Sequence, residues 1–261
     1  MLHIQLVGGP TAVIEVDGLR LVTDPTFDPP GEYGRPDGPT LVKLAPPAVT
    51  VDDVGRADAV LLSHDQHADN LDRAGRAFLA RAPLTLTTSS GAGRLAEDGI
   101  SARGLAPWEH VDLPRDGREP VLVTAVPARH GPEGAEPVSG EVTGFVLTAP
   151  DVPTIYISGD NAWLGAVEQV KSRFGTVDIA LLFAGAARIA GRFDGALLTL
   201  DSDLAAKAAR VLGARFVVPV HYAGWQHFTE GATSLRTAFD RAGLADHLVL
   251  LAPGESASLP T

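Results

Sequence analysis

Side chains of the kind that bind metals follow four apolar runs of this sequence. The first run, residues 59–62, leads directly into the segment 63–72, which holds two His and several carboxylates. Later apolar runs lead in the same way to His130, Asp160 and His221. Since the chain has only 8 His, composition alone does not explain the pattern. It predicts buried strands that deliver ligand side chains to one rim of a sheet.

The residue types narrow the chemistry of such a site. Imidazole and carboxylate are the common nitrogen and oxygen ligands of zinc and of its neighbours in the first transition row. The chain has no Cys, which excludes disulfides, thiolate zinc sites and cysteine nucleophiles. We therefore expect one or two divalent transition metals, with zinc as the first expectation and manganese or iron as alternatives.

Charge and hydropathy restrict the partners. A net charge of −11 repels phosphate backbones and anionic membranes, so we expect a small-molecule substrate rather than a nucleic acid or a membrane. The N-terminal residues do not have the pattern of a signal peptide. No apolar stretch approaches the roughly 20 residues that span a bilayer. The expected location is cytoplasmic, and the oligomeric state is not indicated.

Predicted strands dominate the first half of the chain, and the second half alternates strand and helix. Residues 11–16 and 20–23 predict a hairpin that turns at Asp17-Gly18. Residues 201–212 predict a helix with Asp201 as its N-cap and Gly213 as its stop. Other predicted helices cover 70–80, 89–97, 162–174 and 233–242. This mixture predicts an α+β fold in which two sheets pack together with helices outside, as a single domain over 1–261.

Two further segments carry predictions. Residues 24–47 hold seven of the 20 Pro and predict a long ordered loop, which we expect to cover the site and select the substrate. Residues 248–251 predict the last strand.

These residues resemble the metallo-β-lactamase fold superfamily over nearly the whole chain. The first motif of that family, usually His-x-His-x-Asp-His at a strand end, is similar to residues 64–70. Single ligands after later strands match His130, Asp160 and His221 in order and separation. The resemblance implies a four-layer αββα sandwich with metals at one edge.

Within the superfamily, the chain resembles the branch that holds the ascorbate-phosphate lactonase and the N-acyl-phosphatidylethanolamine phospholipase D. The resemblance is carried by the opening Gly8-Gly9-Pro10, by the Asp24-Pro25 pair and by the unit 218–221, Val-Pro-Val-His.

The chain departs from the family motif at two points. His64 and His67 are three residues apart instead of two, so either His64 or Asp65 takes the first ligand position. Asn70 replaces the last His of the motif, and an amide is a weaker ligand than an imidazole. Asn70 is either a ligand or a helix N-cap, whereas Asp72 is expected to be a helix-cap acid.

The resemblance implies two metal positions. One would be held by His64 or Asp65 with His67 and His130. The other would be held by Asp69 and His221, with Asp160 between the two. Asp69 would also act in catalysis, orienting the attacking water and carrying its proton to the leaving group. Tyr222, Trp225 and His227 either line the substrate pocket or simply pack.

The expected function is therefore that of a metallo-β-lactamase-fold hydrolase. Such an enzyme would use a metal-bound hydroxide on a small ester, lactone or phosphodiester. Cations for a phosphodiester would be Arg35, Lys43 or Arg188. The alternative is a non-catalytic binding protein of the same fold with a degenerate metal site, which the His spacing and Asn70 favour.

Overall fold

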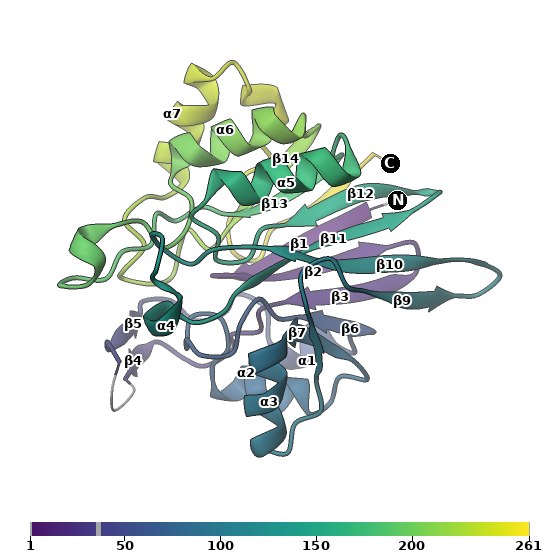
Figure 1. Ribbon diagram of the computed structural model, residues 1–261, viewed down its shortest axis with the longest axis horizontal. Helices are drawn as coiled ribbons and strands as arrows, with labels where there is room; N and C mark the ends of the chain where they lie inside the picture. The colour runs from purple at the N-terminus through teal and green to yellow at the C-terminus, as the bar shows by residue number, and fades with distance from the viewer. Residues whose placement is uncertain (1, 35–37, 261) are drawn as a thin grey trace.

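Two β-sheets pack face to face with helices on both outer sides, which gives the four αββα layers expected from the sequence (Figure 1). The computed structural model describes residues 2–34 and 38–260. Within them the first sheet has seven strands, in the spatial order β15 (Ser256–Leu259), β1 (Leu2–Gly8), β2 (Thr11–Val16), β3 (Leu19–Thr23), β6 (Ala59–Leu61), β7 (Thr85–Thr88) and β8 (Arg103–Leu105).

The second sheet places the ends of its parallel strands at one edge. Within the described residues its six strands are, in spatial order, β14 (Phe216–Val220), β13 (Ile179–Phe183), β12 (Val152–Ile157), β11 (Thr143–Ala149), β10 (Arg118–Pro127) and β9 (His110–Arg115). Strands β12, β13 and β14 are parallel, and β11 runs antiparallel to both β10 and β12. The carboxyl ends of β10, β12 and β14 therefore lie at the same edge.

The helices divide between the two outer faces (Figure 1). Beside the first sheet lie α1 (Val51–Val54), α2 (Arg73–Leu79) and α3 (Ser89–Glu97). Beside the second lie α5 (Leu164–Phe174), α6 (Ser202–Leu212) and α7 (Ala232–Arg241). The short elements α4 (Glu136–Ser139), η1 (Phe193–Gly195) and η2 (Ala245–His247) lie in connections.

Strand alternation explains the two cores. In β1 the buried Leu2, Ile4 and Leu6 belong to the large core that also contains residues of the second sheet, such as Phe145. Val7 at the end of β1 belongs to the smaller core, which lies under α2 and α3. Successive side chains of a strand point to opposite faces, so one apolar strand contributes to both layers of packing.

Several predicted elements are confirmed. The 11–16 and 19–23 arms form the predicted hairpin, with positive φ at Asp17 (49°) and Gly18 (85°), as a type I′ turn requires. Helix α6 begins after Asp201, whose side chain accepts a hydrogen bond from Leu204 N at 2.7 Å. It ends at Gly213, which has a left-handed φ of 67°.

Three predictions need correction. Residues 248–251 are not a strand; they form only one isolated bridge, Val217 to Leu248, and the last strand is β15, which pairs with β1. The predicted loop 24–47 contains a small hairpin, β4 (Gly31–Tyr33) and β5 (Leu41–Lys43). Helix α2 begins at Arg73 instead of residue 70, because Asp72 is its N-cap. None of the helices in the described part of the chain has the length and apolarity needed to cross a bilayer.

Candidate metal centre

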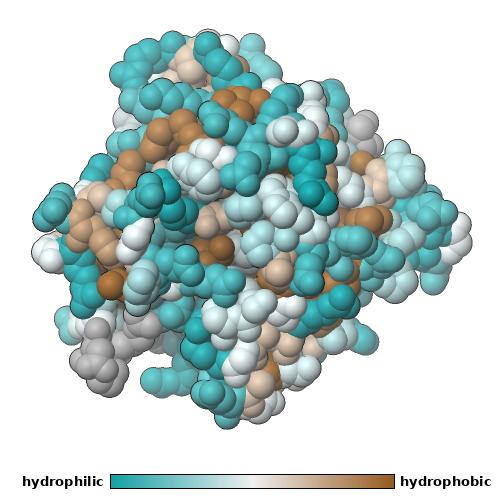
Figure 2. All heavy atoms as spheres, in the orientation of Figure 1, coloured by the Kyte–Doolittle hydropathy of each residue, from teal (hydrophilic) through white to brown (hydrophobic). Residues whose placement is uncertain are grey.

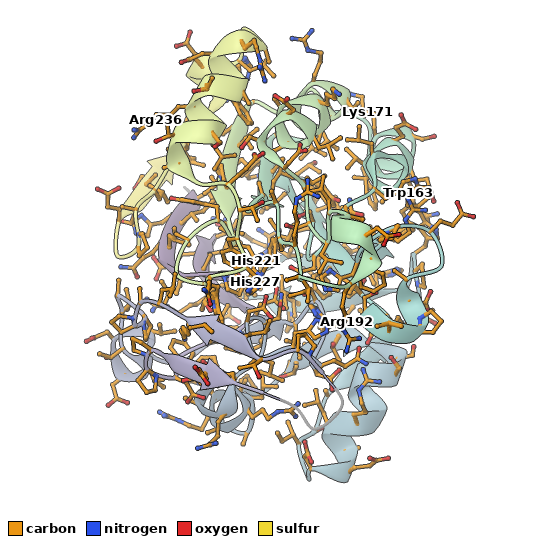
Figure 3. The ribbon with its side chains drawn as sticks, turned by 90° about the vertical axis from the view of Figure 1, so that its left-hand side faces the viewer. Trp163, Lys171, Arg192, His221, His227 and Arg236 are labelled. Carbon is orange, nitrogen blue, oxygen red and sulfur yellow. The ribbon has the colours of Figure 1, made fainter. Side chains whose placement is uncertain are left out.

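The sequence-predicted ligands meet at the edge where the strands end. His64 and its neighbours follow β6, His130 follows β10, Asp160 follows β12 and His221 follows β14. Figure 3 views the molecule from this side and shows His221 and His227 near its middle. The strand topology therefore brings together side chains that are widely separated in the chain.

Three imidazoles form the first ligand cluster. One ring nitrogen from each of His64, His67 and His130 lies within 4.8 Å of the other two. His64 Nε2 and His67 Nδ1 are 2.8 Å apart. His64 and His130 are buried and His67 is half-buried, so the cluster is open on the side of His67.

A backbone carbonyl fixes the tautomer of His130. His130 Nδ1 lies 2.8 Å from Leu198 O. Because a carbonyl oxygen can only accept, Nδ1 carries the proton and Nε2 keeps a lone pair. An outer hydrogen bond of this kind is typical of histidines that bind metals.

Two carboxylates and an imidazole form the second cluster, Asp69, Asp160 and His221. His221 Nε2 lies 3.3 Å from Asp69 Oδ2 and 3.6 Å from Asp160 Oδ1. The other oxygen of Asp160, Oδ2, lies 3.6 Å from His130 Nδ1. The two oxygens of Asp160 thus face histidines of different clusters.

The donor set fits divalent cations. Asp69 Oδ1, Asp160 Oδ2 and both ring nitrogens of His221 are buried and make no hydrogen bond with the described residues. An unsatisfied buried polar group costs about 1–3 kcal/mol, so natural proteins rarely leave several together. A cation bound among them would satisfy the carboxylate oxygens and the one nitrogen of His221 that does not carry the ring proton.

Burial sets the protonation states that ligation needs. Desolvation lowers the pKa of His130 to about 4, and it also lowers the pKa of His64 and His221. Neutral imidazole is the form that binds a metal. Burial would raise the pKa of Asp69, but His227 and His221 hold it well below its usual range. Burial and the Asp69 charge raise the pKa of Asp160.

Of the two alternatives for the first ligand, the geometry selects His64. The Asp65 carboxylate accepts hydrogen bonds from Arg94 of α3, at 2.9 Å from Nε and 2.6 Å from Nη2. Asp65 belongs to neither ligand cluster, so its expected place at the metal is corrected. Adjacent residues point in different directions here, and Arg94 holds Asp65 outside the centre.

Asn70 is not a helix N-cap, because α2 begins after Asp72. Its amide donates to Asp160 Oδ1 at 3.2 Å and so orients that carboxylate. The expected capping role of Asp72 is confirmed, since Asp72 Oδ1 accepts from Gly75 N at 2.8 Å. Asp72 is also paired with the buried Lys43.

The structure places the three residues expected to line the pocket in different surroundings. His227 lines the cavity, and its Nε2 lies 2.9 Å from Asp69 Oδ2. Tyr222 packs in the large core, where its hydroxyl donates to Leu251 O. Trp225 is buried beside Tyr33 and Lys43. The expectation that Tyr222 and Trp225 line the pocket is therefore corrected, and their alternative packing role describes them.

The opening motifs of the sequence support the centre through the backbone. Asp24 Oδ1 accepts from Ser63 N at 2.7 Å, next to His64. Gly9 O accepts from His221 N at 2.7 Å. His221 has a left-handed φ of 57°, a conformation that a residue with a side chain adopts at a cost and that is common at functional sites.

The cavity beside the clusters has a volume of about 730 Å³ and is lined in part by His67, Asp69, His130 and His227. The predicted loop contributes Tyr33 and Leu41 of its hairpin to the wall.

Two of the cations expected for a phosphodiester, Lys43 and Arg188, do not line the cavity. Lys43 is paired with Asp72, Arg188 donates to Gly195 O, and Arg35 lies outside the described residues. Sequence reasoning missed Arg192, which does line the cavity, because nothing in its local pattern separates it from other loop arginines.

Comparisons with known proteins agree with this architecture. Residues 19–222 match the model of the beta-lactamase superfamily domain. A metal-dependent hydrolase from Pelotomaculum thermopropionicum is 31% identical over 211 residues, which cover 78% of this chain and 83% of that protein. The isothiocyanate hydrolase from Delia radicum gut bacteria has the same fold, with a TM-score of 0.82, 22% identity and 98% of each chain covered. A possible metal-dependent hydrolase from Veillonella parvula gives a TM-score of 0.83 at 18% identity, covering 99% of this chain and 100% of that one.

Proposed function

The chain belongs to the metallo-β-lactamase superfamily and is a metal-dependent hydrolase of that fold, and we propose that it cleaves a small ester, lactone or phosphodiester. Two metals would be held by the clusters His64, His67, His130 and Asp69, Asp160, His221. The observation that carries the proposal is the convergence of these six side chains beside one cavity.

Zinc fits this donor set best, since its sites combine imidazole nitrogen with carboxylate oxygen. Manganese and iron accept the same ligand types, and geometry and availability in the cell decide among them. A bound divalent cation would lower the pKa of a coordinated water and polarise the substrate oxygen.

Residues of the chain would transfer the proton of the attacking water. Asp69 lines the cavity, and its Oδ1 has no hydrogen-bond partner among the described residues. Besides its role as a ligand, the Asp69 carboxylate would accept the proton of the attacking water and return it to the leaving-group oxygen as the ester bond breaks. His227, at 2.9 Å from the other oxygen of Asp69, would hold the carboxylate in position.

The cavity supports a small-molecule substrate. Its volume of about 730 Å³ lies in the range of pockets that enclose compact organic ligands. Ligand residues and apolar side chains both line it, which suits a substrate with a reactive polar group and an apolar body.

Elemental analysis of protein purified without chelators tests the metal, and a substrate panel tests the reaction. We expect stoichiometric transition metal and hydrolysis of at least one of a lactone, a 4-nitrophenyl ester and bis(4-nitrophenyl) phosphate. Chelation should abolish hydrolysis, and added zinc or manganese should restore it. Substoichiometric metal with no hydrolysis would instead support the non-catalytic binding protein, whereas unchanged hydrolysis after thorough chelation would rule out the metal-dependent reaction.

A further inference from the structure

One wall of the cavity is apolar. Its residues come from the β4–β5 hairpin, from α4 and from the connection between β13 and α6, and they are Leu41, Pro137, Val138, Ile189, Phe193 and Leu198. Val138 is 50% exposed, which is unusual for a large apolar side chain in this protein. A wall of this kind favours an apolar substrate body, because burying apolar surface is favourable.

Arg192 interrupts this apolar wall with a positive charge. It lies between Ile189 and Phe193 in the chain and lines the same cavity. Its side chain is half-buried and makes no hydrogen bond or ion pair with any described residue. Figure 3 shows Arg192 on the face of the molecule that carries His221 and His227. The loop therefore presents an unmatched guanidinium to the bound molecule.

The carboxylates of the cavity do not need this charge. Asp65 is paired with Arg94, and Asp72 is paired with Lys43. Asp69 is paired with His221 and His227. Asp28 accepts hydrogen bonds from the backbone at the start of α2. Glu32 is exposed on the hairpin. A partly desolvated guanidinium without an acceptor is unfavourable, so a bound anion would offset a real cost.

A second polar group of the cavity also lacks a partner. Ser139, at the end of α4, is 4% exposed, and its hydroxyl makes no hydrogen bond with the described residues. It lines the same cavity as Arg192. A hydroxyl can donate to an oxygen of the same ligand that Arg192 attracts.

We infer that Arg192 binds a carboxylate of the substrate, so that the preferred substrate is an ester or lactone with an apolar body and an anionic group remote from the bond that is cut. This inference rests on the proposed hydrolase function. Guanidinium matches carboxylate with two parallel hydrogen bonds, which fixes orientation as well as adding affinity. On a chain with a net charge of −11, a local cation favours the entry of such a substrate.

The test compares 4-nitrophenyl monoesters of linear dicarboxylic acids with neutral 4-nitrophenyl alkanoates of the same chain length. We expect the metal-loaded wild type to prefer the anionic ester in kcat/KM, with an optimum chain length that matches the span from the metals to Arg192. Arg192→Met should lower kcat/KM for the anionic ester by about 10- to 100-fold and leave the neutral ester within about twofold. Arg236→Met is the matched control, because it removes the same charge from the exposed face of α7 and should not change the preference.

A binding measurement separates failure of this inference from failure of the proposed function. Calorimetry of a non-hydrolysable amide analogue that carries the same carboxylate should show binding about tenfold or more weaker in Arg192→Met than in Arg236→Met. Equal affinities, or an anionic preference that survives Arg192→Met, would overturn the role of Arg192 while leaving hydrolysis intact. Absence of any hydrolysis in the metal-loaded wild type would overturn the hydrolase proposal, and the binding comparison would still decide the anion site.

Discussion

His227 Nε2 lies 2.9 Å from Asp69 Oδ2, although the two residues are 158 positions apart in the chain. Asp69 also lies 3.3 Å from His221 Nε2, so two imidazoles flank one carboxylate. One oxygen of Asp69 is held by this contact and the other is left for the reaction centre. In this arrangement Asp69 is the residue that binds and reacts, and His227 holds it in position.

Asp69→Asn should therefore impair turnover more than folding. The amide keeps the volume of the side chain but cannot accept the proton of the attacking water, so we expect kcat/KM to fall about 100-fold or more. Kinetics and urea unfolding on the same preparations measure the two effects. His227→Gln should cause a smaller loss, because it disturbs only the orientation of Asp69. Wild-type turnover in Asp69→Asn would contradict the assigned role.

Two neighbouring substitutions distinguish the ligand from the ion pair. His64→Gln should lose metal from the first cluster, because it removes one of three converging imidazoles. Asp65→Asn should retain the full metal content, since its carboxylate is bound to Arg94 outside both clusters. Elemental analysis of the two variants, purified in parallel, provides the comparison. Metal loss in Asp65→Asn with retention in His64→Gln would reverse the assignment.

Asn70→Ala tests the orientation of the carboxylate between the two clusters. Asn70 donates to Asp160 Oδ1 at 3.2 Å, and loss of such an outer hydrogen bond typically weakens metal binding about 10- to 100-fold. Metal titration followed by competition with a coloured chelator measures the affinity. Gln66→Ala, which changes another residue of the same segment outside both clusters, should bind metal as the wild type does. Equal affinities in the two variants would refute the positioning role.

Lys43→Met should destabilise the fold strongly. Lys43 Nζ lies 3.2 Å from Asp72 Oδ2, and the two side chains are only 4% and 0% exposed. Removing the ammonium leaves a buried carboxylate without its counter-charge, which costs about 3 kcal/mol. Chemical denaturation measures the loss in the free energy of unfolding. Arg241→Met, which breaks an exposed pair with Asp203, should have little effect, and equal losses would argue against a special role for the buried pair.

The sequence by itself determined the layered fold and most of the ligand set. Apolar runs that end in His or Asp predicted strands whose carboxyl ends share an edge, and the structure places His67, His130, Asp160 and His221 there. The residues that begin and end a helix could also be predicted locally: α6 begins after Asp201 and ends before Gly213, as predicted. Such features depend on backbone periodicity and on side chains a few residues apart, so they are readable from a single sequence.

Only the tertiary structure decided between His64 and Asp65 and excluded Tyr222 and Trp225 from the cavity wall. It also placed Arg192 in that wall as an unpaired cation. It also left the apolar residues 248–251 with only one isolated bridge to β14 and placed the last strand, β15, beside β1. Each of these outcomes depends on a partner that is distant in the chain, as Arg94 is from Asp65. The local sequence determines which side chains are present at a strand or helix end. The direction in which each side chain points, and the residue it pairs with, are set by packing between elements that are distant in the chain.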